Sequence, residues 1–217
     1  MANLTEIKDL REDYRNGTLE ESDLAEHPFQ LFTQWFQHAL ECKIPEPNAM
    51  TLATIRADGR PSARIVLLKG FDEQGLVFYT NYESQKGQEL SGTPFAAVVF
   101  NWLELQQQIR VEGKVERITA AASTDYFQSR PKGSQIGAWA SPQSQVIPGR
   151  EVLEKKVEAL QKQYANQKQL PRPDHWGGFR IIPDNIEFWQ GRSSRLHDRI
   201  RYTLQADGAW KIDRLAP

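Results

Sequence analysis

The stretch MTLATIRADGRPSARIVLLKGFDEQGLVFYT, Met50 to Thr80, decides the fold class. It contains three apolar runs, Met50 to Ile55, Ala63 to Phe71 and Gly75 to Thr80, which are rich in the β-branched and aromatic residues typical of strands. The sequences between them, ADGRP and DEQG, favour turns because glycine, proline and aspartate fit turn conformations. The stretch therefore predicts a three-stranded meander.

Further strands are predicted on both sides of a helical segment. FAAVVFNW from Phe95 and LQQQIRVEGKVERI from Leu105 indicate two strands, and Gly113 in the second favours a bulge or a sharp bend. After the helical segment we expect four short strands, GGFRIIP, NIEFWQG, HDRIRYTL and AWKIDRL, the last two joined at Ala206-Asp207-Gly208.

Three helices are predicted, and they do not alternate regularly with the strands. Pro28 to Cys42, Ala120 to Ser129 and Glu151 to Gln167 have helical patterns. The first helix has an apolar face made of Phe29, Phe32, Trp35, Phe36, Ala39 and Leu40. Because strands and helices do not alternate, we expect a mainly β fold with attached helices, an antiparallel barrel and not a doubly wound sheet.

Composition narrows the class of protein. The chain has 217 residues, of which 39% are hydrophobic, and this is enough for one domain with a core. Its formal net charge of -1 argues against a protein that coats nucleic acid. Cys42 is the only cysteine, which fits a reducing compartment, so we expect a cytoplasmic location. The polar N-terminus and the lack of a long apolar run predict a soluble protein without a membrane partner.

The stretch IEFWQGRSSRLHDRIRY, Ile186 to Tyr202, places several cationic residues beside an aromatic run. If Leu196 to Tyr202 is a strand, alternation puts four of these side chains on one face: Arg195, His197, Arg199 and Arg201. Guanidinium and imidazole groups together suit an anionic ligand that undergoes reaction. The alternative is a solvated edge strand, in which Asp198 pairs with a neighbouring arginine.

Two other segments could bind anions. Arg64 and Lys69 lie five positions apart in RIVLLK, so in a strand they would point to opposite faces and could serve two anions. Charged strand ends that reach solvent are the alternative. In YESQKGQEL, Tyr82 to Leu90, Ser84 resembles an N-cap, and the helix end that it would cap attracts phosphate. A capped surface helix without a ligand is also compatible with this sequence.

Several familiar motifs are absent. The chain has no GxGxxG after a strand and no GxxxxGK[ST], so neither a Rossmann dinucleotide site nor a P-loop is supported. The four histidines lack the spacing of metal ligands, and we predict no metal site. Four aromatic residues could wall a planar cofactor or could form core or an oligomer interface: Trp139, Trp176, Phe188 and Trp189.

Seven motifs together carry a resemblance to a known family. They are RIVLLK, VFYTNYESQKG, YFQSRPKGSQIGAW, SPQS, WGGFR, IEFWQGRSSRLHDR and WKIDRLAP. In this order they resemble the pyridoxamine (pyridoxine) 5'-phosphate oxidases, from about Leu10 to Pro217. The resemblance implies an FMN-binding split β-barrel of Greek-key type over residues 21–217, behind a flexible N-terminal lid of residues 1–20. It also implies a homodimer with FMN bound across the subunit interface.

The resemblance assigns FMN contacts to fifteen residues. They are Arg64, Ile65, Val66, Leu67, Leu68, Lys69, Tyr79, Thr80, Gln85, Lys86, Gln108, Gln143, Ser144, Trp189 and Arg199. The family often has Arg-Lys where this chain has Gln85-Lys86, so a neutral hydrogen bond would replace one charged contact to the flavin phosphate. FMN binding could therefore be weaker.

The resemblance also assigns the substrate contacts. They are Arg11, Tyr14, Lys69, Tyr126, Arg130, Ser134, Arg195, Leu196 and His197. The substrate phosphate would be bound by Lys69, Tyr126, Arg130 and Ser134. Arg195 and His197 are the predicted catalytic residues, and the role of Arg195 is expected to be electrostatic because arginine stays protonated.

The implied reaction oxidises pyridoxamine 5'-phosphate or pyridoxine 5'-phosphate to pyridoxal 5'-phosphate. FMN takes the hydride, and O2 is the final acceptor, which gives H2O2 and, from the amine, NH3. Two other classes stay open at this point, a different split-barrel flavin reductase and a non-catalytic carrier of pyridoxal phosphate. Nucleic-acid binding by the arginine run is the weakest alternative.

Overall fold

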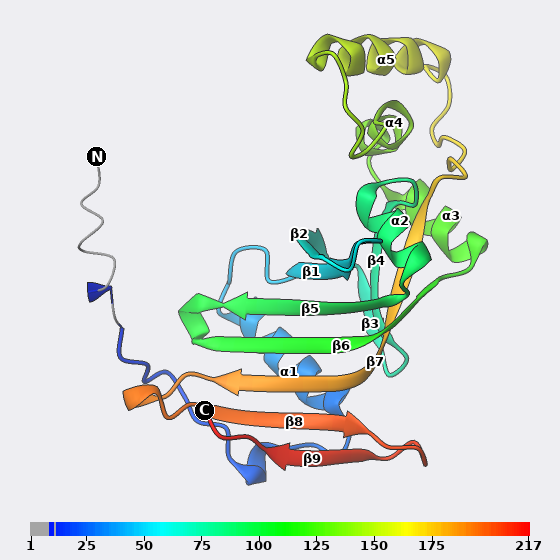
Figure 1. Ribbon diagram of the computed structural model, residues 1–217. Coiled ribbons are helices and arrows are strands. Elements are labelled where there is room, and N and C mark those ends of the chain that lie inside the picture. Colours follow the sequence, from blue (N-terminus) through cyan, green and yellow to red (C-terminus); the bar gives the residue numbers. More distant parts are fainter. Residues whose placement is uncertain (1–8, 11) are drawn as a thin grey trace. The chain divides into compact units, whose positions relative to one another are not determined.

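The computed structural model describes residues 9–10 and 12–217, which form nine strands with attached helices (Figure 1). The strands form one sheet in the order β2-β1-β5-β6-β7-β4-β3, and β8 pairs with β7 and β9. The pairs β1–β2, β3–β4, β4–β7, β7–β8 and β8–β9 are all antiparallel. The predicted fold class, an antiparallel sheet with attached helices, is confirmed.

The chain divides into two compact units. The central unit comprises Asn48–Val98 and Glu112–Pro183, and the terminal unit comprises the chain up to Pro47, Val99–Val111 and Asp184–Pro217. Three strands have residues in both units: β5 (Phe95–Trp102), β6 (Gln107–Arg117) and β7 (Trp176–Gln190). A single domain over residues 21–217 stays a prediction.

Two strand pairs organise the first half of the central unit. β1 (Ala49–Ile55) pairs with β2 (Pro61–Leu67), and β3 (Gly70–Asp72) pairs with β4 (Gly75–Asn81). The predicted meander is wrong, because β2 and β3 stand at opposite ends of the strand order. The chain leaves β2 after Leu67, so RIVLLK is not one continuous strand.

The helices of the central unit are α2 (Gln85–Gly92), α3 (Ala120–Ser129), α4 (Lys132–Ala140) and α5 (Arg150–Gln163). The α3 prediction is confirmed, and α5 is confirmed with an earlier end. The helix α4 was not predicted, because its two glycines and short length weaken the helical signal. In Figure 1, α4 and α5 lie beside each other in the chain segment between β6 and β7.

The long strands differ from their predicted form in two places. β7 is one strand that runs through Pro183, where two short strands were expected. β6 runs through Gly113 without a break, and a Cβ at this position would collide with the carbonyl oxygen of Ile182. Gly113 is therefore needed for the close approach of two backbones.

The core of the terminal unit is built on α1 (Pro28–Glu41), as predicted, with the His27 side chain capping its first turn. Phe32 packs edge-on against Phe100 at 5.4 Å, and Trp35 against Phe188 at 5.3 Å. Each such buried side chain contributes about 2 kcal/mol. Leu40 was assigned to this apolar face incorrectly, since it is 54% exposed.

The terminal unit ends in the hairpin of β8 (Asp198–Leu204) and β9 (Trp210–Arg214), which lie side by side in Figure 1. The predicted turn is confirmed, and Gly208 has the positive φ of 87° that this turn requires. β8 begins at Asp198, so Arg195 and His197 precede the strand. The predicted single cationic face of one strand is therefore wrong.

Candidate functional site

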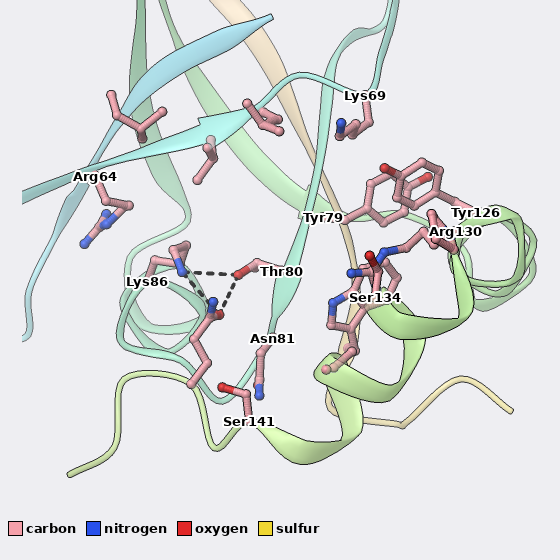
Figure 2. Close-up of a pocket in the computed structure, with 18 residues that line it drawn as sticks. Arg64, Lys69, Tyr79, Thr80, Asn81, Lys86, Tyr126, Arg130, Ser134 and Ser141 are labelled. Atoms are coloured by element: carbon pink, nitrogen blue, oxygen red, sulfur yellow. Dashed lines mark hydrogen bonds between the residues drawn. The ribbon is translucent and has the colours of Figure 1, made fainter. Parts of the chain in front are cut away.

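A cavity of about 860 Å³ lies in the central unit (Figure 2). Its walls come from β2, β4, α2, α3, α4, the first residue of β7, and the segments that follow β2, α3 and α4. The predicted residues on its lining are Arg64, Ile65, Val66, Leu67, Lys69, Tyr79, Thr80, Lys86, Tyr126, Arg130, Ser134 and Gln143. The fold thus brings most of the predicted cofactor and phosphate contacts of this unit together.

One cationic place in the cavity adjoins the start of α2. The hydroxyl of Ser84 accepts a hydrogen bond from the Gly87 amide at 3.3 Å and caps this helix, as predicted. Arg64 and Lys86 lie beside it (Figure 2). Positive side chains and an N-terminal helix end together make this place attractive to phosphate.

Lys86 is buried without an acidic partner among the described residues. Its side-chain nitrogen, Nζ, lies 3.2 Å from the hydroxyl of Thr80, 3.4 Å from that of Ser84 and 3.4 Å from the amide oxygen of Gln143. Burial lowers the pKa of Lys86, the nearby Arg64 lowers it further, and Glu89, which is already paired with Arg64, acts in the opposite direction. A bound anion would supply the counter-charge that these neutral oxygens do not provide.

Arg64 already has an acidic partner, Glu89. The guanidinium donates to the carboxylate of Glu89 at 2.9 Å and also to the hydroxyl of Thr54. Gln85 donates to the same carboxylate at 2.9 Å. Burial alone would raise the pKa of Glu89, but hydrogen bonds from Thr54, Gln85 and Arg64 outweigh it and lower that pKa.

A second cationic place lies around Arg130. Its guanidinium stacks on the ring of Trp176 at 4.6 Å, and one of its terminal nitrogens, Nη1, is buried with no hydrogen-bond partner in the described part of the chain. Burial lowers the pKa of Arg130. A buried donor without a partner is costly, so an anion in the cavity is the natural group to satisfy it.

Three further predicted phosphate contacts line the same cavity. Tyr126 stacks on Tyr79 with 3.9 Å between ring centroids, while Ser134 and Lys69 are exposed. In Figure 2, Arg130 and Ser134 lie across the cavity from Arg64 and Lys86. The cavity therefore has two separate places for anions.

The prediction from alternation, that Arg64 and Lys69 point to opposite faces of one strand, is wrong. Lys69 follows the end of β2, and both side chains line the same cavity, although Figure 2 shows them well separated. Leu68 is 5% exposed and belongs to the core, off the cavity lining. Ser144 also lies off the lining, with a positive φ of 72°.

Five residues on the lining of this cavity were not predicted. They are Gly137 and Ala138 of α4, Pro131 directly before this helix, Ser141 directly after it, and Asn81 of β4. A signal for them exists in the sequence. Ser134, Gly137, Ala138 and Ser141 follow the spacing of one helix face, which a ligand could approach closely.

A second cavity, of about 560 Å³, lies in the terminal unit. The predicted residues Tyr14, Trp189, Arg195 and His197 line it, together with Leu10, Glu12, Asp13, Arg192 and Ser194. The His197 ring lies 4.5 Å from that of Trp189 and 5.8 Å from that of Tyr14. Burial lowers the pKa of His197, Arg195 lowers it further, and Asp198 acts in the opposite direction.

Other arginines of this segment are held by carboxylates. Arg199 donates to Glu187 at 2.8 Å and 3.1 Å, and Arg201 to Asp213 at 3.2 Å. Asp198 pairs with Arg192 at 2.7 Å, as predicted for the alternative in which this segment is a solvated edge strand. These ion pairs give Arg199 and Arg201 structural partners within the chain.

Three remaining predicted site residues are not found on the lining of either cavity. Gln108 lies in β6 and Leu196 is 69% exposed, and neither lines the two cavities. Arg11 lies outside the described residues. In the part of the chain that is described, no group of three or more His, Cys, Asp or Glu side chains is arranged for a metal ion. Within the same residues, none of the helices has both the length and the apolar character of a membrane-spanning segment.

Comparisons with known proteins cover nearly the whole chain. Residues 36–164 match the family model described as pyridoxamine 5'-phosphate oxidase, and residues 176–217 match the pyridoxine 5'-phosphate oxidase C-terminal dimerisation region. A pyridoxine/pyridoxamine 5'-phosphate oxidase of Acaryochloris marina is 55% identical, over 98% of this chain and 96% of that protein. Its counterpart from Trichormus variabilis is 56% identical, over 97% of this chain and 98% of that protein.

Two solved structures have similar folds. PhzG from Burkholderia lata, in complex with tetrahydrophenazine-1-carboxylic acid, is 32% identical with a TM-score of 0.86, over 92% of this chain and 98% of that chain. A pyridoxamine 5'-phosphate oxidase-related, FMN-binding protein from Nostoc punctiforme has a TM-score of 0.71 at 18% identity, over 89% of this chain and 98% of that chain. The second likeness concerns the fold alone.

Proposed function

The chain belongs to the pyridoxamine 5'-phosphate oxidase family, and from that premise we propose that it oxidises pyridoxamine 5'-phosphate and pyridoxine 5'-phosphate to pyridoxal 5'-phosphate. FMN is the cofactor, and O2 is the electron acceptor. When bound, FMN supplies the redox chemistry by taking a hydride from the C4' carbon and passing two electrons to O2, which yields H2O2. With the amine substrate, water completes the reaction and NH3 is released.

One observation carries this proposal: a single cavity has two cationic places, and in each a buried cation lacks an acidic partner among the described residues. These are Lys86 beside the start of α2, and Nη1 of Arg130. FMN and the substrate each bring one phosphate. The presence of two cationic places on one cavity therefore fits one phosphorylated cofactor and one phosphorylated substrate.

We assign the flavin phosphate to the place beside α2. Lys86 and Arg64 supply positive charge there, and Gln85 lies next to them. The capped helix end adds amide donors. The other flavin contacts that we assign on the cavity lining are Ile65, Val66, Leu67, Lys69, Tyr79, Thr80 and Gln143. Leu68 and Ser144, which lie off this lining, stay predicted contacts.

We assign the substrate phosphate to Arg130, with Lys69, Tyr126 and Ser134. Binding energy from the phosphate is remote from the reacting C4' carbon, so these residues serve to orient the pyridine ring. Arg195 and His197 are assigned to the reacting amine or alcohol, while Tyr14, Leu196 and Arg11 are assigned further substrate contacts. Trp189, Gln108 and Arg199 keep their assignment to the flavin.

We further propose a homodimer with FMN bound across the subunit interface. The match of residues 176–217 to a dimerisation region supports the dimer.

Aerobic assays of the purified protein test the reaction. The expected result with either phosphorylated substrate is formation of pyridoxal 5'-phosphate with matching O2 uptake and H2O2. Binding of pyridoxal phosphate without O2 uptake would indicate a carrier, and flavin reduction by NADH alone would indicate a reductase. Turnover restricted to a reduced phenazine carboxylate, the ligand class of the PhzG structure, would contradict the proposed substrates.

A further inference from the structure

The segment between β7 and β8 is a loop whose two ends are joined by an ion pair. The guanidinium of Arg192 lies 2.7 Å from the carboxylate of Asp198. That carboxylate also accepts a hydrogen bond from the Leu19 amide at 3.1 Å and pairs with Arg214 at 2.9 Å. Arg192 and Asp198 therefore hold the loop at a fixed width.

The backbone inside the loop turns sharply. The Leu196 amide donates to the Ser193 carbonyl at 3.1 Å, and Ser194 and Arg195 have positive φ angles of 55° and 62°. Two consecutive non-glycine residues in the left-handed region are unfavourable without support from their surroundings. The conformation brings the ring of His197 back to the start of the loop.

A hydrogen bond at this point identifies the protonation state of His197. The backbone amide of Arg192 donates to Nδ1 of the imidazole at 3.1 Å. A backbone amide has a proton to give and cannot accept one, so Nδ1 must hold a free lone pair. In the neutral ring the proton then resides on Nε2.

We propose that this loop fixes His197 as a neutral imidazole with its proton on Nε2, so that His197 acts as a hydrogen-bond donor to the substrate and not as its proton acceptor. The tautomer follows from the loop geometry alone. The role toward the substrate rests on the proposed function.

The surroundings of His197 agree with a neutral ring. Arg195, which lines the same cavity, would repel an imidazolium, and Trp189 and Tyr14 partly cover the ring. Asp198 favours the charged form but is already held by Arg192 and Arg214.

The donor role has a consequence for the substrate. Arg195 and His197 would both offer N–H groups, and neither would offer a free lone pair. An amine placed between them must therefore present its own lone pair, so it would bind unprotonated.

The other titratable groups on the lining of this cavity are Glu12, Asp13, Tyr14 and Arg192. Asp13 is paired with Arg15 at 2.6 Å.

Nitrogen NMR of protein labelled with ¹⁵N-histidine tests the tautomer directly. The resonances of His197 are assigned by their loss in His197→Gln, and His38→Gln, an exposed site on α1, serves as the control. Near neutral pH we expect Nδ1 at the position of a non-protonated nitrogen and Nε2 at that of a protonated one. The reverse pattern, or two protonated nitrogens, would overturn the proposal whether or not the protein oxidises pyridoxamine phosphate.

Two substitutions then separate a donor from a base. Glutamine can place an N–H near the position of Nε2, whereas asparagine reaches only about as far as Nδ1. We expect His197→Gln to keep kcat within about 10-fold of the parent protein, and His197→Asn to lose at least a further 10-fold. Equal losses of about 100-fold or more in both variants would instead indicate proton transfer by His197. Absence of turnover in the parent protein would reject the proposed function and leave the NMR result to decide the tautomer.

Discussion

The cations of the central cavity and those of the segment around β8 differ in what they contact. Among the described residues, Nη1 of Arg130 is buried without a hydrogen-bond partner, and Nζ of Lys86 contacts neutral oxygens. Around β8, in contrast, carboxylates neutralise the arginines: Arg199 is paired with Glu187 and Arg201 with Asp213, although Nε of Arg201 is also buried without a hydrogen-bond partner. Clustered arginines alone therefore do not identify a ligand site, and the more informative signal is a buried cation whose counter-charge is missing.

The largest effect is expected at Arg130. Replacing Arg130 with leucine removes the charged donors assigned to the substrate phosphate, so KM for pyridoxamine 5'-phosphate should rise about 100-fold while FMN stays bound. Steady-state kinetics and flavin absorbance check this. Arg180→Met is the control. It removes a guanidinium that is already paired with the exposed Asp72, so KM should hardly change. Equal effects of the two variants would contradict the assignment.

A paired cation should matter to stability more than to binding. Glu187 accepts from Arg199 at 2.8 Å and from Arg110 at 3.4 Å, and it is 7% exposed. Glu187→Gln should lower the free energy of unfolding by about 2 kcal/mol, because it leaves a partly buried arginine without its counter-charge. Urea unfolding measures this change. The exposed pair of Glu154 and Arg150 is the control, and Glu154→Gln should cost less than about 0.5 kcal/mol.

Lys86 should affect binding without supporting the fold. Lys86→Met should weaken FMN binding about 10-fold through loss of one charged contact. The flavin-free protein should be no less stable, since the variant removes a buried cation. Fluorescence titration of FMN and urea unfolding check both points, with the exposed Lys114→Met as control. Loss of stability without loss of FMN affinity would show that Lys86 is structural.

The pH dependence of FMN binding follows from the same lysine. Burial and the neighbouring Arg64 lower the pKa of Lys86 in the folded protein. Between this lowered pKa and the ordinary value for lysine, the unfolded chain holds a proton that the folded protein has released, so stability rises with pH there. FMN needs the charged form, and its affinity should therefore fall as pH rises through the folded pKa. This fall should be missing in Lys86→Met.

The smallest effect is expected at Gln85. Its side chain donates to Glu89 at 2.9 Å and to Ser62 at 3.3 Å, beside the place assigned to the flavin phosphate. Gln85→Arg should tighten FMN binding about 3-fold, a gain limited because the new guanidinium can also pair with Glu89. Gln88→Arg adds the same charge at an exposed position of α2 and should leave affinity unchanged. A similar gain in both variants would point to net charge in place of a specific contact.

The sequence predicts elements whose signals are local. The face of α1, the Ser84 cap and the hairpin turn at Gly208 depend on spacing and on residue type, and all three are confirmed. Strand order does not follow from local pattern. The break after Leu67 sends the chain from one end of the strand order to the other, which neighbouring residues alone could not reveal.

The candidate site shows the same limit. Motif resemblance selected most residues of the central cavity, but alternation placed Arg64 and Lys69 wrongly because it assumed an unbroken strand. The partners of the arginines around β8 could not be predicted either. Glu187 and Asp213 are 12 residues from Arg199 and Arg201, and only the pairing of β8 with its neighbours brings them together.

The central claim is that the two cationic places bind two phosphates, one on the flavin and one on the substrate. Its most direct test is the visible spectrum of the purified, FMN-loaded protein under anaerobic conditions, with pyridoxamine 5'-phosphate added to one sample and pyridoxamine to another at the same concentration. We predict that the flavin absorbance bleaches with the phosphorylated amine, returns in air, and stays unchanged with the amine that lacks phosphate. Failure of the protein to bind FMN, or equal bleaching by both amines, would contradict the claim.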